Sequence, residues 1–223
     1  MNLLAIETSS DVGTVALESD DGLRQERIET PREQTAKILP LIDELIDSAE
    51  LTLTRLDAIA FGRGPGSFTG IRVAAAVAQG LGLSANLPLL PISSLAAVAQ
   101  GAWRTQGQEH SLVCFDARMG EVFWAPFQIR GGLPELIGEE RLSEPDAVCW
   151  PDSQAWGAVG SGFDTYAARL AGQLEQATSV RGAVSPEAAD LLPLARSQLK
   201  SGNSVPAPAA APVYLRGQSA WSK

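Results

Sequence analysis

The segment of residues 71–85 constrains the fold of this chain more than any other part of the sequence. Its composition is helical and both sides of the expected helix are apolar: one carries Ile71, Ala74, Ala75 and Ala78, and another carries Val73, Val77, Leu81 and Ser84. A helix without a polar face must be buried on two sides. Such a helix lies either inside a large domain or between its own domain and another chain. Because the half of the chain around it is small, we favour the second arrangement.

A glycine-rich turn precedes this helix. Residues 58–61 are predicted as a buried strand that runs into residues 62–70, where Ser67 or Thr69 is placed to cap the helix. Glycines allow a backbone to approach a ligand closely, and a helix N-terminus offers N–H groups to an anion. The lysine and hydroxyl of the GxxxxGK[ST] phosphate loop are missing, however, and the spacing is not that of GxGxxG. We therefore favour a tight turn that caps a close-packed helix over an anion site.

The first part of the chain predicts a meander of three strands. Short runs at residues 3–6 and 14–17 are separated by a polar turn, which is typical of strands, and a third strand at residues 23–28 would complete the meander. Apolar residues at helical spacing over residues 38–49 then predict an amphipathic helix.

The turn after the first strand carries polar side chains that offer two interpretations. Thr8, Ser9 and Ser10 form either a phosphate-binding loop or a turn that satisfies its own backbone. Glu7 and Asp11 are candidate metal ligands or general bases, although solvated turn carboxylates are the favoured interpretation.

The second half of the sequence echoes the first. An apolar run at residues 112–116 ends in an acidic residue, and a turn at residues 117–120 leads to a second apolar run at residues 121–124. The same order of strand, acidic residue, glycine turn and strand occupies residues 3–17. The echo predicts either an internally duplicated fold or a hairpin that follows an acidic residue by coincidence. Asp116, Arg118 and Glu121 form a charged turn, either a contact site or a plain β-turn.

We expect two domains, residues 1–108 and residues 109–223. Further short strands are predicted at residues 128–130, 136–138 and 158–160, and helices near residues 166–174 and 186–199. A Pro/Ala-rich spacer at residues 203–212 then delivers Tyr214 and Leu215, which we expect to pack on a domain surface, including that of the first lobe.

Composition excludes several classes of protein. The two cysteines, Cys114 and Cys149, are far apart and predict neither a disulfide scaffold nor a thiolate metal site. A single histidine, His110, cannot form a two-histidine metal site. The formal net charge of -9 repels phosphate, so we expect no binding of nucleic acid by this chain alone. Polar residues and prolines interrupt the longest uncharged stretch, and the N-terminus lacks a basic region, so we expect no membrane span and a cytoplasmic location.

Four motifs in the right order, from residue 3 to residue 216, carry a resemblance to a known family. They are LAIETSS at residues 4–10, GPGSFTGIR at residues 64–72, DARMGEV at residues 116–122 and PVYLR at residues 212–216. Together they resemble the bacterial TsaB family, formerly called YeaZ. The resemblance implies an α/β fold of the actin-like ATPase and sugar-kinase superfold with two RNase H-like lobes. It also implies a role in making threonylcarbamoyladenosine next to the anticodon of tRNAs that read codons beginning with A.

The resemblance also implies that this chain is not itself the catalyst. The catalytic paralogue TsaD carries a His-x-x-x-His pair that binds the catalytic metal, and Ser94 and Val98 occupy that spacing here. A neutral serine hydroxyl is a poor metal ligand and valine has no donor atom. We therefore expect a pseudoenzyme without catalytic residues, metal or cofactor of its own, with ATP and a metal bound by TsaD.

The family implies that two helices of the first lobe, residues 34–49 and residues 70–86, bind TsaD as a mixed bundle. The candidate contact residues are Ile38, Ile42, Val73, Ala74, Val77, Ala78 and Leu81. Further implied partners are the ATPase TsaE, tRNA through the complex only, and a second copy of the chain when TsaD is absent.

Three other functions are consistent with parts of the sequence. One is a stand-alone ATP-dependent kinase or acyltransferase of the same superfold, with nucleotide contacts from Thr8, Ser9 and Ser10. The others are a peptidase, which lacks a credible nucleophile and base here, and a plain homodimeric binding module.

Overall fold

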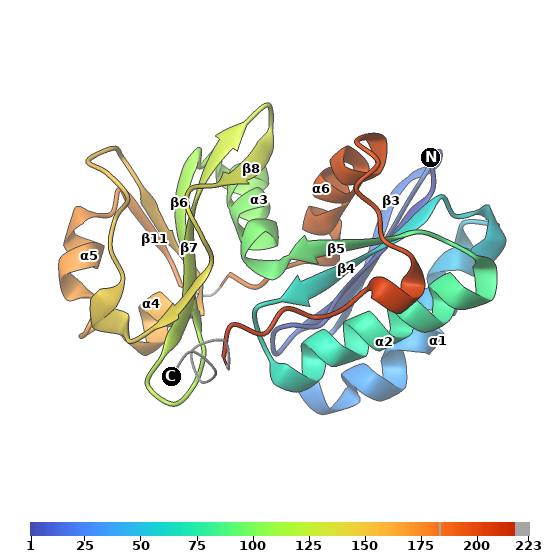
Figure 1. Ribbon diagram of the computed structural model, residues 1–223, viewed down its shortest axis with the longest axis horizontal. Helices are drawn as coiled ribbons and strands as arrows, with labels where there is room; N and C mark the ends of the chain where they lie inside the picture. The colour runs from blue at the N-terminus through green and yellow to red at the C-terminus, as the bar shows by residue number, and fades with distance from the viewer. Residues whose placement is uncertain (183, 217–223) are drawn as a thin grey trace. The chain divides into compact units, whose positions relative to one another are not determined.

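The computed structural model describes residues 1–182 and 184–216, which form two compact units (Figure 1). The first unit comprises Met1–Ser94 and Pro186–Val213, and the second comprises Leu95–Ser185 and the residues from Tyr214 on. The N-terminal segment of the first unit ends at Ser94, whereas the sequence analysis placed the boundary between residues 108 and 109. The polar stretch before His110 only connects α3 (Ser94–Gln106) to the next strand. The C-terminal segment returns to the first unit because the first sheet has a second face that needs cover.

A five-stranded sheet in the order β3-β2-β1-β4-β5 forms the first unit. The predicted meander is confirmed as β1 (Leu3–Glu7), β2 (Gly13–Ser19) and β3 (Gly22–Ile28), which pair antiparallel. β4 (Ala58–Gly64) and β5 (Leu89–Ser93) extend the sheet in parallel to β1. Every residue of β1 is buried, because helices cover both faces of the sheet.

Three helices cover this sheet. α1 (Gln34–Ser48) and α2 (Phe68–Ala85) lie side by side on one face, and α6 (Ala188–Lys200) lies on the other (Figure 1). The core under α1 and α2 is built from alternate strand residues, among them Leu4, Ile6, Val15, Leu17, Ile59 and Phe61. This alternation places the apolar side chains of neighbouring strands on one face.

The second unit holds a sheet in the order β11-β10-β6-β7-β8, with β9 paired to β7. Its strands are β6 (His110–Asp116), β7 (Val122–Arg130), β8 (Leu133–Leu136), β9 (Arg141–Ser143), β10 (Gly157–Val159) and β11 (Ser179–Arg181). Its short helices are α4 (Ser161–Thr165) and α5 (Ala171–Gln176). Single 3-10 turns occur at Pro31–Glu33, Leu53–Arg55, Pro145–Ala147 and Ala207–Ala209.

The two sheets share one topology. When β9 is left out of the count, the strand order along the chain within each unit is third, second, first, fourth, fifth. In each, the first three strands are antiparallel and the fourth and fifth follow in parallel. The predicted duplication is confirmed, because a coincidental hairpin would not reproduce the parallel pair as well.

α2 is the one helix among the described residues that is long and apolar enough to cross a membrane by length and composition. Core helices of folded domains meet the same criteria. Ala74 and Ala78 of α2 are fully buried in the core of the first unit.

Candidate functional site

Glu7 ends β1 and is fully buried. Its carboxylate accepts a hydrogen bond from the Ser9 backbone N–H at 2.6 Å and another from the Ser94 hydroxyl at 2.8 Å. Burial raises the pKa of Glu7 above its ordinary value, and the hydrogen bonds from Ser9 and Ser94 oppose this rise. The expected solvated carboxylate is therefore wrong for Glu7, which instead connects β1, the first turn and the start of α3.

Three glycines between the end of β4 and the first turn of α2 lie against Glu7 and the turn that follows it. A Cβ added at any of them would clash: at 2.1 Å from Oε2 of Glu7 for Gly62, at 2.4 Å from the carbonyl oxygen of Ser9 for Gly66, and at 1.7 Å from the carbonyl oxygen of Thr8 for Gly70. No side chain fits at these three positions, so the glycines allow two segments of this chain to pack closely and leave no space there for a ligand. The predicted tight turn is confirmed.

Ser67 caps α2. Its Oγ accepts a hydrogen bond from the Gly70 N–H at 3.3 Å, and its own N–H donates to the carbonyl oxygen of Ser9 at 2.7 Å. One of the two predicted caps is thereby confirmed. The N-terminus of α2 is consequently bound to the first turn.

The candidate nucleotide contacts lie in the same first turn. Thr8 and Ser9 are 0% and 4% exposed, and the Thr8 hydroxyl donates to the carbonyl oxygen of Gly70 at 2.7 Å. The Ser10 hydroxyl donates to the carbonyl oxygen of Val12 at 2.9 Å. A nucleotide contact by Thr8 or Ser9 would therefore require the turn to open.

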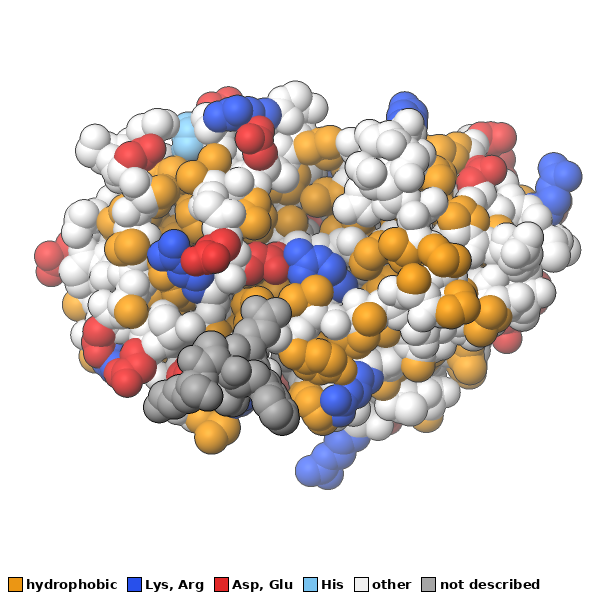
Figure 2. Space-filling view, in the orientation of Figure 1, with side chains coloured by type: hydrophobic (Ala, Val, Ile, Leu, Met, Phe, Trp, Pro, Cys, Tyr) orange, Lys and Arg blue, Asp and Glu red, His pale blue; other side chains and the backbone are white. Residues whose placement is uncertain are grey.

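The outer side of α2 forms a surface that we call the α2 strip. Its exposed residues are Phe68, Thr69, Arg72, Ala76, Gly80, Leu83 and Ser84, and its half-buried apolar residues include Val73, Val77 and Leu81. Phe68 and Leu83 are 60% and 63% exposed. Arg72, the only charged residue of the helix, lies with its guanidinium carbon 3.4 Å from the centroid of the Phe68 ring. Figure 2 shows hydrophobic side chains gathered along this part of the first unit.

The strip differs from the contact residues expected from the sequence. Val73, Val77 and Leu81 lie at its edge, whereas Ile38, Ile42, Ala74 and Ala78 are at most 1% exposed. These four belong to the core of their own unit, so they cannot contact a partner in this conformation. The sequence analysis missed Phe68, Ala76 and Leu83. Helical phase groups Phe68, Ala76 and Leu83 on one side of the helix, but only the packing on the sheet shows that this side faces outward.

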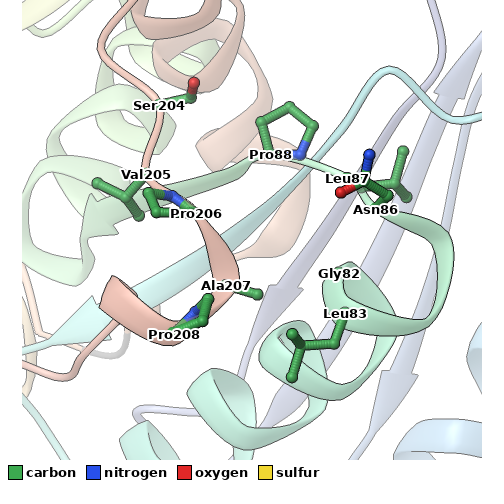
Figure 3. A pocket seen from close by; sticks show the side chains of 10 residues that line it. All are labelled: Gly82, Leu83, Asn86, Leu87, Pro88, Ser204, Val205, Pro206, Ala207 and Pro208. Atoms are coloured by element: carbon green, nitrogen blue, oxygen red, sulfur yellow. The ribbon is translucent and has the colours of Figure 1, made fainter.

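A pocket of about 380 Å³ opens at the C-terminal end of α2 (Figure 3). Residues 82–83 and 86–88 line one side and residues 204–208 line the other, without a charged side chain. Val205 pairs with Leu89 of β5, which holds the proline-rich segment beside the helix. Leu83 belongs to both the strip and the pocket, so the two surfaces are continuous.

The family resemblance aligns residues 94 and 98 with the metal-binding histidine pair of TsaD. Ser94 donates its hydroxyl to Glu7, and Val98 offers no ligand atom. Within residues 1–182 and 184–216, no three His, Cys, Asp or Glu side chains are grouped so as to hold a metal ion. His110 packs edge-on against Trp156 with ring centroids 5.2 Å apart.

The duplicated sheet places the chain in the actin-like ATPase and sugar-kinase superfold, with two RNase H-like lobes. The family model described as TsaD, tRNA N6-adenosine threonylcarbamoyltransferase, matches residues 28–218. The tRNA threonylcarbamoyladenosine biosynthesis protein TsaB of Escherichia coli K12 is 38% identical over 100% of this chain and 98% of its own length. The TsaB protein of Haemophilus influenzae is 34% identical over 100% and 97%. The chain belongs to the TsaB family.

Solved structures agree with this assignment. YeaZ from Pseudomonas aeruginosa is 38% identical, with a TM-score of 0.88 over 96% of this chain and 99% of that one. A second structure has a TM-score of 0.89 and is described as an uncharacterized protein with similarity to peptidase YEAZ from the same organism.

Proposed function

We propose that this chain is a non-catalytic partner subunit of the TsaD transferase. It is required for transfer of the threonylcarbamoyl group to N6 of the adenosine next to the anticodon, in tRNAs that read codons beginning with A. Membership of the TsaB family supports the pathway. The single observation that carries the partner role is the exposed α2 strip.

The strip suits association with another protein because its exposed residues are mostly small or apolar, and removing such surface from water is favourable. Ala76, Gly80 and Leu83 are exposed on a helix with one charged residue, and two large apolar side chains stand at its ends. Small residues let a facing helix approach closely, and Phe68 and Arg72 are of types that are enriched at protein–protein interfaces. The strip continues into the pocket beside Leu83.

In this proposal TsaD supplies ATP binding, the catalytic metal and, with the assembled complex, the surface for tRNA. The chain holds TsaD in its active geometry through α1 and α2. TsaE joins as the ATPase component, and the same strip pairs two copies of the chain when TsaD is absent. The complex works in the cytoplasm.

The alternative is a stand-alone ATP-dependent kinase or acyltransferase. The enclosed Thr8 and Ser9, and the glycines filled by the chain's own backbone, count against it. Calorimetry with ATP and magnesium separates the two functions: tight binding by the chain alone would favour the enzyme. A peptidase is also disfavoured. The one histidine of the sequence packs on Trp156, and no nucleophile is hydrogen-bonded to it among the described residues.

The partner role is tested by placing a charge in the middle of the strip. Ala76→Asp should weaken binding to purified TsaD at least about tenfold, because a carboxylate buried in an apolar interface loses its hydration. The same variant should be monomeric in light scattering. Val180→Asp, at a 49% exposed position in the second unit, is the matched control and should bind like wild type. Equal affinity of Ala76→Asp and wild type for TsaD would refute the interface.

A further inference from the structure

α1 and α2 run in the same direction along the first sheet. β3, β1, β4 and β5 are parallel to one another, because β2 is antiparallel to both β3 and β1. α1 connects β3 to β4 and α2 connects β4 to β5, so both helices return antiparallel to these strands. Their N-termini therefore lie at one end of the sheet and their C-termini at the other.

The two ends of this helix pair differ in charge. The charged residues at the N-terminal end are Arg32, Glu33, Lys37 and Arg72, and those at the C-terminal end are Asp43, Glu44 and Asp47. A second copy with its helices parallel to the first would bring the acidic ends together. An antiparallel copy sets each acidic end against a basic one, and it also places helix N-termini, which carry partial positive charge, beside C-termini. Charge complementarity therefore favours an antiparallel second copy.

The outer side of α2 is self-complementary in this antiparallel arrangement. Arg72, Ala76 and Gly80 follow one another there at a spacing of four residues, and all three are exposed. In a two-fold pair, each contact of one residue with another is repeated with the copies exchanged. An axis at Ala76 thus sets Arg72 against Gly80 twice, and the long side chain meets the position without one. The small residues at the axis let the helices approach closely.

The same register brings Phe68 of one copy to the pocket at the C-terminal end of α2 in the other. Phe68 lies on one side of Ala76 along the helix, and the pocket residues Leu83 and Asn86 lie at a similar separation on the other side. Exchanging the two ends about Ala76 therefore superimposes the position of Phe68 on that of the pocket.

Phe68 also faces the side of α2 on which the pocket opens. At about 3.6 residues per turn, Gln79 lies about three turns after Phe68 and Asn86 about five, so the three share one side. Gln79 donates a hydrogen bond to the carbonyl oxygen of Ala210, in the proline-rich segment beside the pocket, and Asn86 lines the pocket itself. A two-fold axis that crosses the helices at a right angle between the copies keeps this side common to both.

The pocket is large enough for the ring of Phe68. It measures about 380 Å³ and has no charged side chain in its lining, whereas an apolar cavity of about 150 Å³ is enough to hold benzene. Phe68 is 60% exposed in the single chain, so insertion removes apolar surface of both the ring and the pocket from water.

We propose that a second copy of this chain covers the strip in one register, antiparallel about a two-fold axis at Ala76, with Phe68 of each copy inserted into the pocket of the other. The inference rests on the proposed function, which assigns the strip to binding another chain. It adds the register of the pair and the side chain that sets it.

The register is tested by oxidation of single-cysteine variants of the full chain without TsaD. The exposed Cys149 is first replaced by serine, and Cys114 stays because it is buried. Ala76→Cys should then form a disulfide-linked dimer under mild oxidation, because the two copies of position 76 meet at the axis. Gly80→Cys is the matched control on the same helix. It should not link to itself, because position 80 faces position 72 of the other copy.

The insertion of Phe68 is tested by sedimentation equilibrium of the chain with its natural cysteines. Phe68→Ser should weaken self-association at least tenfold and leave the melting temperature unchanged. Leu23→Ser, at a 55% exposed position on β3, is the control and should associate within twofold of wild type.

Linkage through position 76 but not position 80, together with weakened pairing of Phe68→Ser, supports the proposal. Failure of Ala76→Cys to link, equal linkage of Gly80→Cys, or wild-type association of Phe68→Ser would overturn it. Neither experiment contains TsaD, so these results are separate from the titration of Ala76→Asp against TsaD, which tests the proposed function.

Discussion

Each of three glycines between the end of β4 and the first turn of α2 faces a specific atom of the chain. Gly62, Gly66 and Gly70 face Glu7, Ser9 and Thr8, and together they let the first turn lie directly on the helix N-terminus. The sequence shows the glycines but not what approaches them, because a ligand and the chain's own backbone require the same absence of a side chain. The contact had to be seen in three dimensions.

Gly70→Ala should destabilise the first unit by roughly 3 kcal/mol or more, since its Cβ would lie 1.7 Å from a backbone oxygen that cannot move freely. Gly80→Ala on the same helix is the matched control, because nothing lies within 4 Å of its added Cβ. The control should gain about 0.5–1 kcal/mol from helix propensity. Urea unfolding of both variants measures the difference, and similar stabilities would contradict the packing role of Gly70.

Glu7 makes stability depend on pH in an unusual direction for a carboxylate. Its pKa is raised in the folded chain above the ordinary 4.5 that applies to the unfolded chain. Between those two values the folded state binds more protons, so the free energy of unfolding falls as pH rises.

Glu7→Gln keeps the shape and cannot titrate. The stability of this variant relative to wild type should therefore increase as pH rises from about 4.5, and become constant above the folded pKa of Glu7. Denaturant unfolding at a series of pH values measures it. A relative stability that stays flat or declines over this range would show that the pKa of Glu7 is not raised.

The helix α2 combines a core face and a partner face in one element. Its composition predicted burial on two sides, and the sheet accounts for one of them. Sequence could not say which residues face outward, because alanine and glycine occupy both sides and the phase depends on how the helix lies on β4. This is why Ala74 and Ala78 were expected at the interface and are found in the core.

The two faces of α2 should respond differently to added volume. Ala74→Leu should cost roughly 1–3 kcal/mol, because the fully buried position has no room for three more carbons. Ala76→Leu, two residues further on the exposed side, should change stability by no more than about 0.5 kcal/mol. Thermal or chemical unfolding compares them, and equal losses would mean that the helix is oriented otherwise.

Other elements show why strand boundaries were harder to predict than strand existence. One strand was expected at residues 121–124 and a separate short strand at residues 128–130. In the structure β7 continues to Arg130, since β9 pairs with residues 122–124 and β8 with residues 127–130, which leaves Pro126 at the gap between them. β5 and α3 were not assigned at all, because prolines and serines interrupt that apolar stretch.

At the scale of the whole molecule, the repeated topology was visible in the sequence only as a faint echo. Residues 3–17 and 112–124 share a pattern of strands and an acidic residue, whereas their later strands and helices differ in length. The family resemblance supplied the superfold, and the strand order of both units agrees with it.

The net charge of the molecule bears on its relation to tRNA. With a formal charge of -9, the chain alone should bind tRNA more weakly than about 100 µM at physiological salt, because few arginines and lysines are available to displace counterions. The complex with TsaD should bind more tightly and with a steeper dependence on salt. Filter binding at several salt concentrations tests this, and micromolar binding by the chain alone would contradict it.

The central claim is that this chain supports the modification of tRNA by binding TsaD and does not itself catalyse the transfer. The most direct measurement is the formation of threonylcarbamoyladenosine on tRNA in purified reactions that hold the chain alone, TsaD with its other components, or both. We expect product only when TsaD and the chain are together, and a loss of product with Ala76→Asp. Transfer catalysed by the chain in the absence of TsaD would contradict the claim.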